Sequence, residues 1–174
     1  MFTEQIRVPK ERVAVFIGKA GAARRHLERL LGVHIIVDSK EGIVTLQGEV
    51  SLSVFEAKPV VRAIARGFSP ATASELSKEN SILEVVDITG FAGKSKKKLL
   101  RLKSRCIGVN GKARSTIEEM TSAHICVYGK TVAILGSIDS VLLARKAIES
   151  LLKGAPHSNV YRAIIESRRR FTNL

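Results

Sequence analysis

Two segments of the chain repeat the same pattern of glycine, basic and apolar residues, and this repeat limits the possible folds more than any other feature. IGKAGAARRHLER begins at Ile17, and IGVNGKARSTIEE begins at Ile107. Gly18 corresponds to Gly108, a shift of 90 residues (108 − 18), and Gly21 corresponds to Gly111. Matching residues continue downstream while the shift changes slightly. We therefore expect two copies of one supersecondary unit whose loops differ in length.

Each copy predicts the order strand, helix, glycine turn, helix, strand, strand, helix. Ala23, Leu27, Leu30 and Leu31 recur at helical spacing after the first glycine pair. β-rich stretches follow at 33–37 and 43–46, and a closing helix over 52–66 contains Pro59, which should kink it. The same order is expected in the second copy. The expected parts are a first domain at 1–68, a linker with a short helix at 69–80, a second domain at 81–155 and a C-terminal helix or tail at 156–174.

The charge of the chain indicates a polyanionic partner. It has 29 Lys and Arg against 16 Asp and Glu, a net charge of +13 over 174 residues. Hydrophobic residues make up 45%, which excludes a disordered chain and leaves enough apolar surface for a core. Nucleic acid and an anionic membrane surface both fit such a charge.

The sequence predicts no signal peptide, no membrane-spanning segment and no metal site formed by its cysteines. The first residues have no apolar run typical of a signal peptide, and no stretch approaches the ~20 apolar residues of a membrane span. Cys106 and Cys126 have neither CxxC spacing nor a nearby pair of histidines, so we expect no zinc site, other metal or cofactor. A reducing cytoplasm is the expected compartment.

The glycine pairs have a physical role at a turn between two helices. Glycine adopts backbone angles and permits close approaches that a Cβ forbids. The following helix begins at once, so its free N–H groups and the positive end of its dipole face the turn. A phosphate backbone can therefore pass close to it, beside basic side chains. The candidate RNA-binding residues are Gly18, Lys19, Ala20, Gly21, Arg24 and Arg25 in the first copy, and Gly108, Val109, Asn110, Gly111, Lys112 and Arg114 in the second.

This arrangement resembles the GxxG loop of KH domains, which clamps a backbone of about four nucleotides. A single GxxG between helices is more often a plain turn. Here it occurs twice, at the same place in the same element order, in a basic chain. Aromatic residues are only 5%, so base stacking cannot dominate. Aliphatic side chains are expected to form the floor for the bases instead: Leu27, Ile35, Ile117 and Ile125.

A basic run precedes the second glycine pair. It spans 94–105, with apolar residues on one stripe of the expected helix. Such a run is usually a solvated face, but this one adjoins the glycine turn, so we expect RNA contact. The residues proposed for that contact are Lys94, Lys96, Lys97, Lys98 and Arg101.

Whole segments of the chain resemble the archaeal Partner-of-Nob (Dim-type) KH proteins. The resemblance is densest in CIGVNGKARSTIEEMTSAHICVYGKTVAILG and in ARKAIESLLKGAPHSNVY. It implies an α+β fold with two tandem type I KH domains, each a three-stranded antiparallel sheet on three helices. It also implies single-stranded RNA near the 3′ end of precursor small-subunit rRNA as ligand and a Nob-type endonuclease as partner. The KH protein itself would cut nothing. One departure is that Val109 and Asn110 stand where KH loops often carry a basic residue.

Enzymatic alternatives have weaker support in the sequence. Gly93, Lys94 and Ser95 lie between a strand and a helix, as in a nucleotide-binding P-loop, but Ile88 stands where that motif needs glycine. His34 and His124 occupy matching positions without an acidic neighbour in sequence, so we expect a packing role. A nuclease, an NTPase and a general KH-type RNA chaperone or decay module remain the alternatives to a non-catalytic assembly factor.

Overall fold

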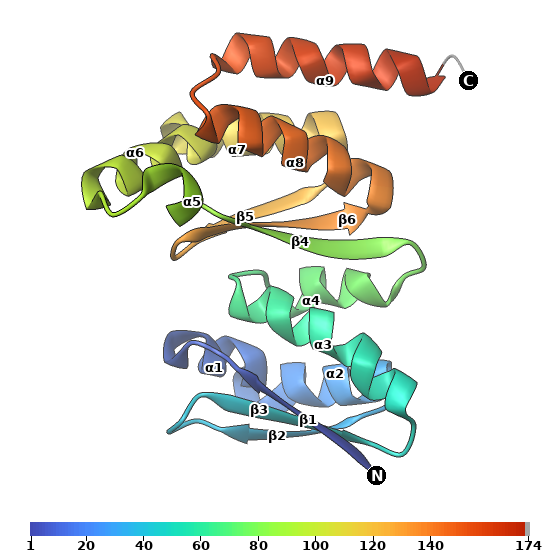
Figure 1. Cartoon of the computed structure of the whole chain (residues 1–174). Helices are drawn as coiled ribbons and strands as arrows, with labels where there is room; N and C mark the ends of the chain where they lie inside the picture. The colour runs from blue at the N-terminus through green and yellow to red at the C-terminus, as the bar shows by residue number, and fades with distance from the viewer. Residues whose placement is uncertain (173–174) are drawn as a thin grey trace. The chain divides into compact units, whose positions relative to one another are not determined.

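The computed structural model describes residues 1–172, and the chain divides into two compact units. The first is Met1–Ser81 and the second begins at Ile82. Each unit has one three-stranded antiparallel sheet with helices on one face (Figure 1). The expected α+β class with two repeated units is confirmed. Among the described residues, no helix is both long and apolar enough to cross a bilayer.

The first unit follows the predicted element order. Strand β1 (Phe2–Arg7) leads to α1 (Lys10–Ile17), a 3-10 turn η1 (Lys19–Gly21) and α2 (Ala22–Leu31). Strands β2 (His34–Asp38) and β3 (Ile43–Gly48) precede α3 (Ser51–Ala65), which includes Pro59 without ending there. A short α4 (Pro70–Ala73) and a 3-10 turn η2 (Ser74–Ser77) follow. Ser69 caps α4 by accepting a hydrogen bond from the Thr72 amide, and Pro70 is the first residue of the helix.

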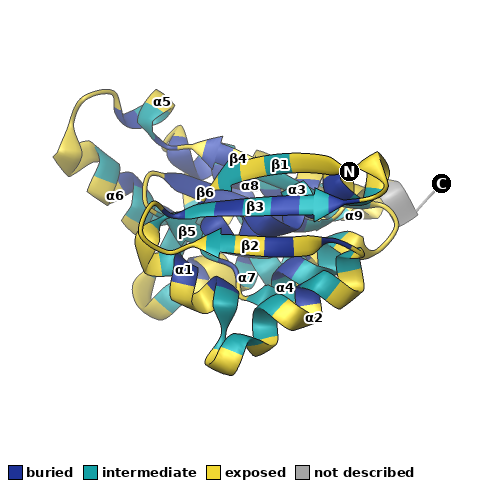
Figure 2. Cartoon of the chain, turned by 90° about the horizontal axis from the view of Figure 1, so that it is seen from below, coloured by how far each residue is buried: buried dark blue, intermediate teal, exposed yellow. Residues whose placement is uncertain are grey.

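The register of the first sheet places the apolar residues of β3 against the helices. The strand order is β1-β3-β2, with β3 central (Figure 2). Val44 and Leu46 are fully buried, and the alternate residues Thr45 and Gln47 pair with Ile36 and His34 on the opposite face. This alternation is the pattern of a sheet with one solvated face.

The second unit repeats the order with additions. Strand β4 (Ser81–Asp87) is followed by a short α5 (Thr89–Ala92), then α6 (Lys96–Ile107), a 3-10 turn η3 (Val109–Gly111) and α7 (Lys112–Thr121). Strands β5 (His124–Tyr128) and β6 (Thr131–Ser137) precede α8 (Ile138–Leu152) and α9 (His157–Thr172). The sequence reasoning did not predict α5. Asp87 stabilises its start, because a carboxylate oxygen of Asp87 accepts hydrogen bonds from the amide and the hydroxyl of Thr89.

Helix α9 packs on α7 and α8, on the side away from the sheet (Figure 1). Val160 and Ile164 of α9 belong to the same buried cluster as Ile117 and Ile148. In the first unit, η2 packs against α2 and α3 in a comparable way. Pro70 corresponds to His157 at the shift of 87 residues (157 − 70), so α4 corresponds to the start of α9.

An arginine stabilises the carboxyl end of the third long helix in each unit. Arg12 donates to the carbonyls of Ile64 and Phe68 at 2.9 and 2.6 Å. Arg105 donates to the carbonyls of Leu151 and Ala155 at 3.2 and 2.6 Å. Each arginine therefore connects the last turn of the helix to the loop that follows it, and its positive charge complements the helix dipole. Arg105 belongs to the basic run 94–105, and here it has a structural role.

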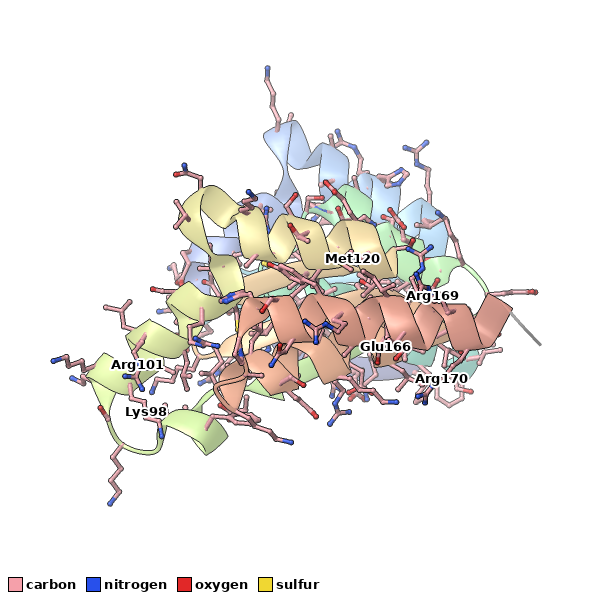
Figure 3. All side chains as sticks on the ribbon, turned by 90° about the horizontal axis from the view of Figure 1, so that it is seen from above. Lys98, Arg101, Met120, Glu166, Arg169 and Arg170 are labelled. Carbon is pink, nitrogen blue, oxygen red and sulfur yellow. The ribbon has the colours of Figure 1, made fainter. Side chains whose placement is uncertain are left out.

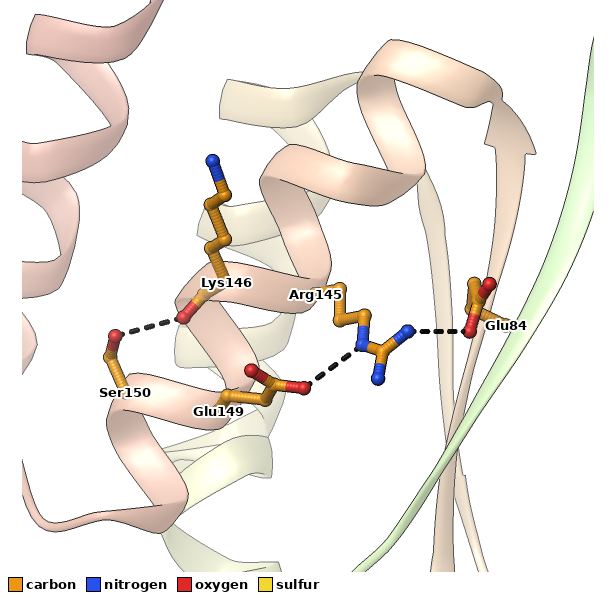
Figure 4. Close-up of polar contacts among 5 residues, drawn as sticks. All are labelled: Glu84, Arg145, Lys146, Glu149 and Ser150. Carbon is orange, nitrogen blue, oxygen red and sulfur yellow. Dashed lines mark hydrogen bonds and ion pairs between the residues drawn. The ribbon is translucent and has the colours of Figure 1, made fainter.

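Arg145 of α8 connects that helix to strand β4 (Figure 4). Its guanidinium lies 2.9 Å from Glu149 on the same helix and 2.9 Å from Glu84 on β4. The hydrogen bond to Glu149 and the negative charge of both carboxylates raise the pKa of Arg145. Ser150 donates its hydroxyl proton to the carbonyl of Lys146 one turn earlier, within the helix.

Candidate nucleic-acid interface

The two glycine turns have the same backbone conformation. Gly18 and Gly108 have φ/ψ of 74°/176° and 76°/176°. The third residues, Ala20 and Asn110, have φ/ψ of 49°/30° and 52°/30°. The fourth, Gly21 and Gly111, have 75°/13° and 76°/9°. Because the residues between the glycines differ, we attribute the shared geometry to the glycines and to the helices on both sides.

The first glycine of each turn is needed for close packing as well as for its backbone angles. A Cβ on Gly18 would lie 2.6 Å from Cβ of Ala23, and one on Gly108 would lie 2.6 Å from Cβ of Ala113. The combination of positive φ with ψ near 180° is open to glycine alone. The alanines that pack against these glycines, Ala23 and Ala113, are matching residues of the repeat, so both copies carry the same glycine–alanine contact.

The helices after the turns begin without a side-chain cap. Neither α2 nor α7 has a side-chain hydrogen bond at its N-cap glycine. The two residues between each glycine pair are exposed, with Val109 81% accessible. Backbone N–H groups at an open helix start, together with the positive end of the dipole, form a surface suited to phosphate oxygens.

Basic side chains flank both turns. Lys19 and Arg25 are exposed or partly exposed in the first unit, and Lys112 is accessible in the second. Arg24 and Arg114 each face a glutamate one helical turn later. Nε of Arg24 is 4.0 Å from Glu28, and Nε of Arg114 is 3.7 Å from Glu118. Part of their charge is therefore directed to these carboxylates, and the lysines are the better-placed cations for a ligand.

Glu28 and Glu118 support the edge strand of each site, a role that the sequence reasoning missed. Glu28 accepts a hydrogen bond from the Ile35 amide at 2.9 Å, and Glu118 accepts one from the Ile125 amide at 2.7 Å. Each bond connects the second helix to the start of β2 or β5. The sequence does single out these two residues, because Glu28 and Glu118 occupy matching positions of the repeat.

The prediction of which aliphatic residues form the floor for the bases was wrong. Leu27, Ile35 and Ile117 are 0% exposed and Ile125 is 2% exposed, so their side chains belong to the core and offer no surface to a base. The core side of α2 and α7 and the inward face of β2 and β5 carry the same apolar pattern that a binding groove would carry. The partly exposed apolar residues near these elements are Ile17, Val37, Ile107 and Val127.

The basic residues of the second unit do not form one patch. Lys94, Lys96, Lys97, Lys98 and Arg101 are all exposed. Figure 3 shows Lys98 and Arg101 at one end of the unit and Arg169 and Arg170 of α9 at the other. Arg168 also contributes to packing, since its guanidinium donates to the carbonyl of Met120 at the end of α7 at 3.0 Å.

The residues that suggested enzymatic chemistry have structural roles where the structure describes their contacts. Ser95, in the P-loop-like segment, is the N-cap of α6 and accepts a hydrogen bond from the Lys98 amide at 3.1 Å. Nδ1 of His34 lies 3.1 Å from Glu28, an acidic partner that the fold supplies. Burial raises the pKa of the Cys106 thiol to about 11. Within residues 1–172, no three His, Cys, Asp or Glu side chains are grouped to hold a metal ion.

Comparisons with known proteins agree with this geometry. A model of the eukaryotic type KH-domain (KH-domain type I), from the second KH domain of PNO1, matches residues 82–169, and a KH domain model matches residues 3–63. A KH domain-containing protein of Methanocaldococcus jannaschii is 42% identical over 171 residues, which cover 96% of this chain and 74% of that one. RNA-binding protein PNO1 of Oryzias latipes is 33% identical over 107 residues, covering 61% of this chain but only 44% of the relative.

A solved structure matches almost the whole chain. It is a chain in the crystal structure of an a/eIF2α–aDim2p–rRNA complex from Pyrococcus horikoshii, with a TM-score of 0.88 and 39% identity, covering 99% of this chain and 96% of that chain. Two type I KH units, two matching GxxG turns and these relatives lead to one conclusion. The chain is a KH-domain RNA-binding protein and belongs to the archaeal Dim2/PNO1-like (Partner-of-Nob) family.

Proposed function

We propose that this protein is a non-catalytic factor in assembly of the small ribosomal subunit, acting in the cytoplasm on the 3′ region of the precursor rRNA. The observation that carries the proposal is the pair of GxxG turns with one backbone conformation, each opening onto an uncapped helix. A neighbour at 39% identity was solved in a complex with rRNA, which supports rRNA as the ligand class.

In this proposal, phosphates of single-stranded RNA lie against each of the two turns. The residues that hold them are the glycines with Lys19, Ala20, Arg24 and Arg25, and Val109, Asn110, Lys112 and Arg114 in the second unit. The bases lie toward the edge strands β2 and β5. The apolar contacts come from the partly exposed pairs Ile17 with Val37, and Ile107 with Val127.

Crosslinking in cells tests the RNA assignment. The protein would be crosslinked to RNA and the bound fragments sequenced. We expect fragments concentrated near the 3′ end of the small-subunit rRNA and its precursor. Fragments spread over messenger RNA would contradict the ribosomal role and favour a general RNA chaperone or decay module.

A cleavage assay tests the proposed partnership with a Nob-type endonuclease. Precursor RNA would be incubated with this protein, with the endonuclease, and with both, in the presence of Mg²⁺ and ATP. We expect no cleavage and no ATP hydrolysis by this protein alone, and faster or more accurate cleavage when both proteins are present. Turnover of RNA or ATP by this protein alone would favour an enzyme. An endonuclease that is indifferent to this protein would refute the partnership.

A further inference from the structure

The amino end of α6 carries a cluster of five exposed cations, which we call the lysine turn: Lys94, Lys96, Lys97, Lys98 and Arg101. The sequence contains no Asp or Glu between Asp87 and Glu118. In the described part of the chain, none of the five forms an ion pair with a carboxylate. The lysine turn is therefore a positive surface that the unit itself does not neutralise.

The position of these cations is unfavourable for the helix. The amino end of a helix is the positive end of its dipole, where acidic residues stabilise and cations destabilise. Helices α1 and α8 follow this rule with Glu11 and Asp139 in their first turns. Helix α6 instead has Lys96, Lys97 and Lys98 in its first turn and no acidic residue there. The stability of α6 does not explain three lysines in its first turn, whereas binding of an external polyanion does.

The lysine turn is separated from the second GxxG turn by the whole length of α6. From Lys96 to Gly108 the helix rises about 18 Å, at 1.5 Å per residue. The core-facing residues Leu102 and Cys106 are buried, so the helix is held firmly on the unit. A GxxG turn clamps about four nucleotides, with their phosphates at the loop itself. The cations at the far end of α6 therefore face RNA other than the phosphates at the turn.

We propose that the lysine turn binds the phosphate backbone of RNA that flanks the single-stranded segment held by the second KH unit. This inference rests on the proposed RNA-binding function and extends it. Exposed lysines hold phosphates as point charges without reading bases. The second KH unit would then select the sequence, and the lysine turn would add affinity only when the bound segment continues into further RNA.

The test compares two RNA lengths. One RNA is a single strand of about six nucleotides, enough for one KH groove. The other carries the same six nucleotides within a longer RNA, made once with single-stranded flanks and once with a flanking hairpin. The variant replaces Lys94, Lys96, Lys97 and Lys98 by Gln, which keeps good helix propensity. The matched control replaces four other accessible cations of the same unit by Gln: Lys146, Lys153, Arg162 and Arg169.

We expect the lysine-turn variant to bind the longer RNA at least about tenfold more weakly than the parent, and the short RNA within about twofold. Its salt dependence on the longer RNA should become shallower by about 0.7 for each single-strand phosphate that the variant no longer binds. The control should bind both RNAs as the parent does. Comparison of the two flanks shows whether single-stranded or duplex phosphates are bound.

Three results would overturn the inference while leaving the proposed function intact. They are unchanged binding of the longer RNA by the variant, an equal loss of affinity for both lengths, and an equal loss of affinity in the control. Failure of the parent to bind either RNA would instead refute the proposed function. Melting of the variant at or above the temperature of the parent would show that the weaker binding is not due to unfolding.

Discussion

Gly108 and Gly111 are required in the second turn for different physical reasons. Gly108 has φ 76° and ψ 176°, and a Cβ there would lie 2.6 Å from both the amide nitrogen and Cβ of Ala113. Gly111 has φ 76° and ψ 9°, and a Cβ there would meet nothing within 4 Å. The left-handed region occupied by Gly111 is open to other residues at a cost. Ala20 and Asn110 already occupy it in the two turns.

We therefore expect the two alanine substitutions to differ. Gly111→Ala should reduce the free energy of unfolding by about 1–2 kcal/mol, the cost of a left-handed alanine. Gly108→Ala should cost more than that, because the steric clash with Ala113 adds to a backbone conformation that only glycine adopts. Denaturant unfolding of both variants measures the difference. Equal reductions in stability would contradict the assignment of a packing role to Gly108.

The two cysteines should differ in reactivity. Burial raises the pKa of Cys106 to about 11, whereas Cys126 is only partly buried. A thiol reagent at pH 8 should therefore modify Cys126 first and Cys106 only after unfolding, because the thiolate is the reactive form. The raised pKa also means that the unfolded chain releases this proton first, so stability should fall as the pH rises above about 9. Rapid modification of Cys106 in the folded protein would contradict the described burial.

At the scale of elements, the helices are connected by side chains that bond to the carbonyls of other helices. Arg105 of α6 holds the end of α8 through the carbonyls of Leu151 and Ala155. The carbonyl of Arg105 in turn lies 2.9 Å from Nε2 of His157, the first residue of α9. One residue therefore connects three helices of the second unit.

Removal of the Arg105 side-chain bonds should destabilise the second unit. We expect Arg105→Met to reduce the free energy of unfolding by about 2–3 kcal/mol, because it removes two charge-assisted hydrogen bonds and a cation at the carboxyl end of α8. Arg101→Met, on the exposed side of the same helix, is the control and should change stability by less than about 0.5 kcal/mol. Similar destabilisation in both variants would argue against the capping role of Arg105.

The order of helices and strands in both units could be predicted from the sequence, because the same pattern of residues occurs in each copy of the repeat. The glycine spacing and the apolar periods gave the element order of both units, and the extra helix at 156–174 was expected. The base-contact residues could not be predicted in the same way. Leu27 and Ile35 have the apolar spacing of a groove floor, but they are buried in the core, and one sequence pattern fits both. Arg105 was indistinguishable in sequence from its solvated basic neighbours.

At the scale of the whole molecule, a net charge of +13 and two GxxG turns on one chain predict a particular mode of binding. Each bound phosphate on a single strand contributes about −0.7 to the slope of log affinity against log salt. We expect a slope of roughly −3 or steeper if both turns contribute. We also expect single-stranded RNA to bind more strongly than a blunt duplex of the same sequence. Titrations at several salt concentrations measure both. A flat salt dependence, or equal binding of the duplex, would contradict binding through the turns.

The most direct test of the central claim is the affinity for rRNA of variants with acidic residues between the glycines. One variant carries Lys19→Asp and Ala20→Asp, and the other Val109→Asp and Asn110→Asp. All four positions are exposed, so both variants should melt near the temperature of the parent. Lys19→Ala is the control for the larger charge change in the first variant.

We predict that both variants bind the RNA more weakly, because aspartates at the turns repel phosphates. The second-turn variant should weaken binding more, because the exposed Lys112 directly follows that turn and the resemblance to the Partner-of-Nob proteins is densest around it. A larger effect in the first-turn variant would reverse this ranking of the two units. Folded variants that both bind with the affinity of the parent would contradict the claim that the GxxG turns hold the RNA.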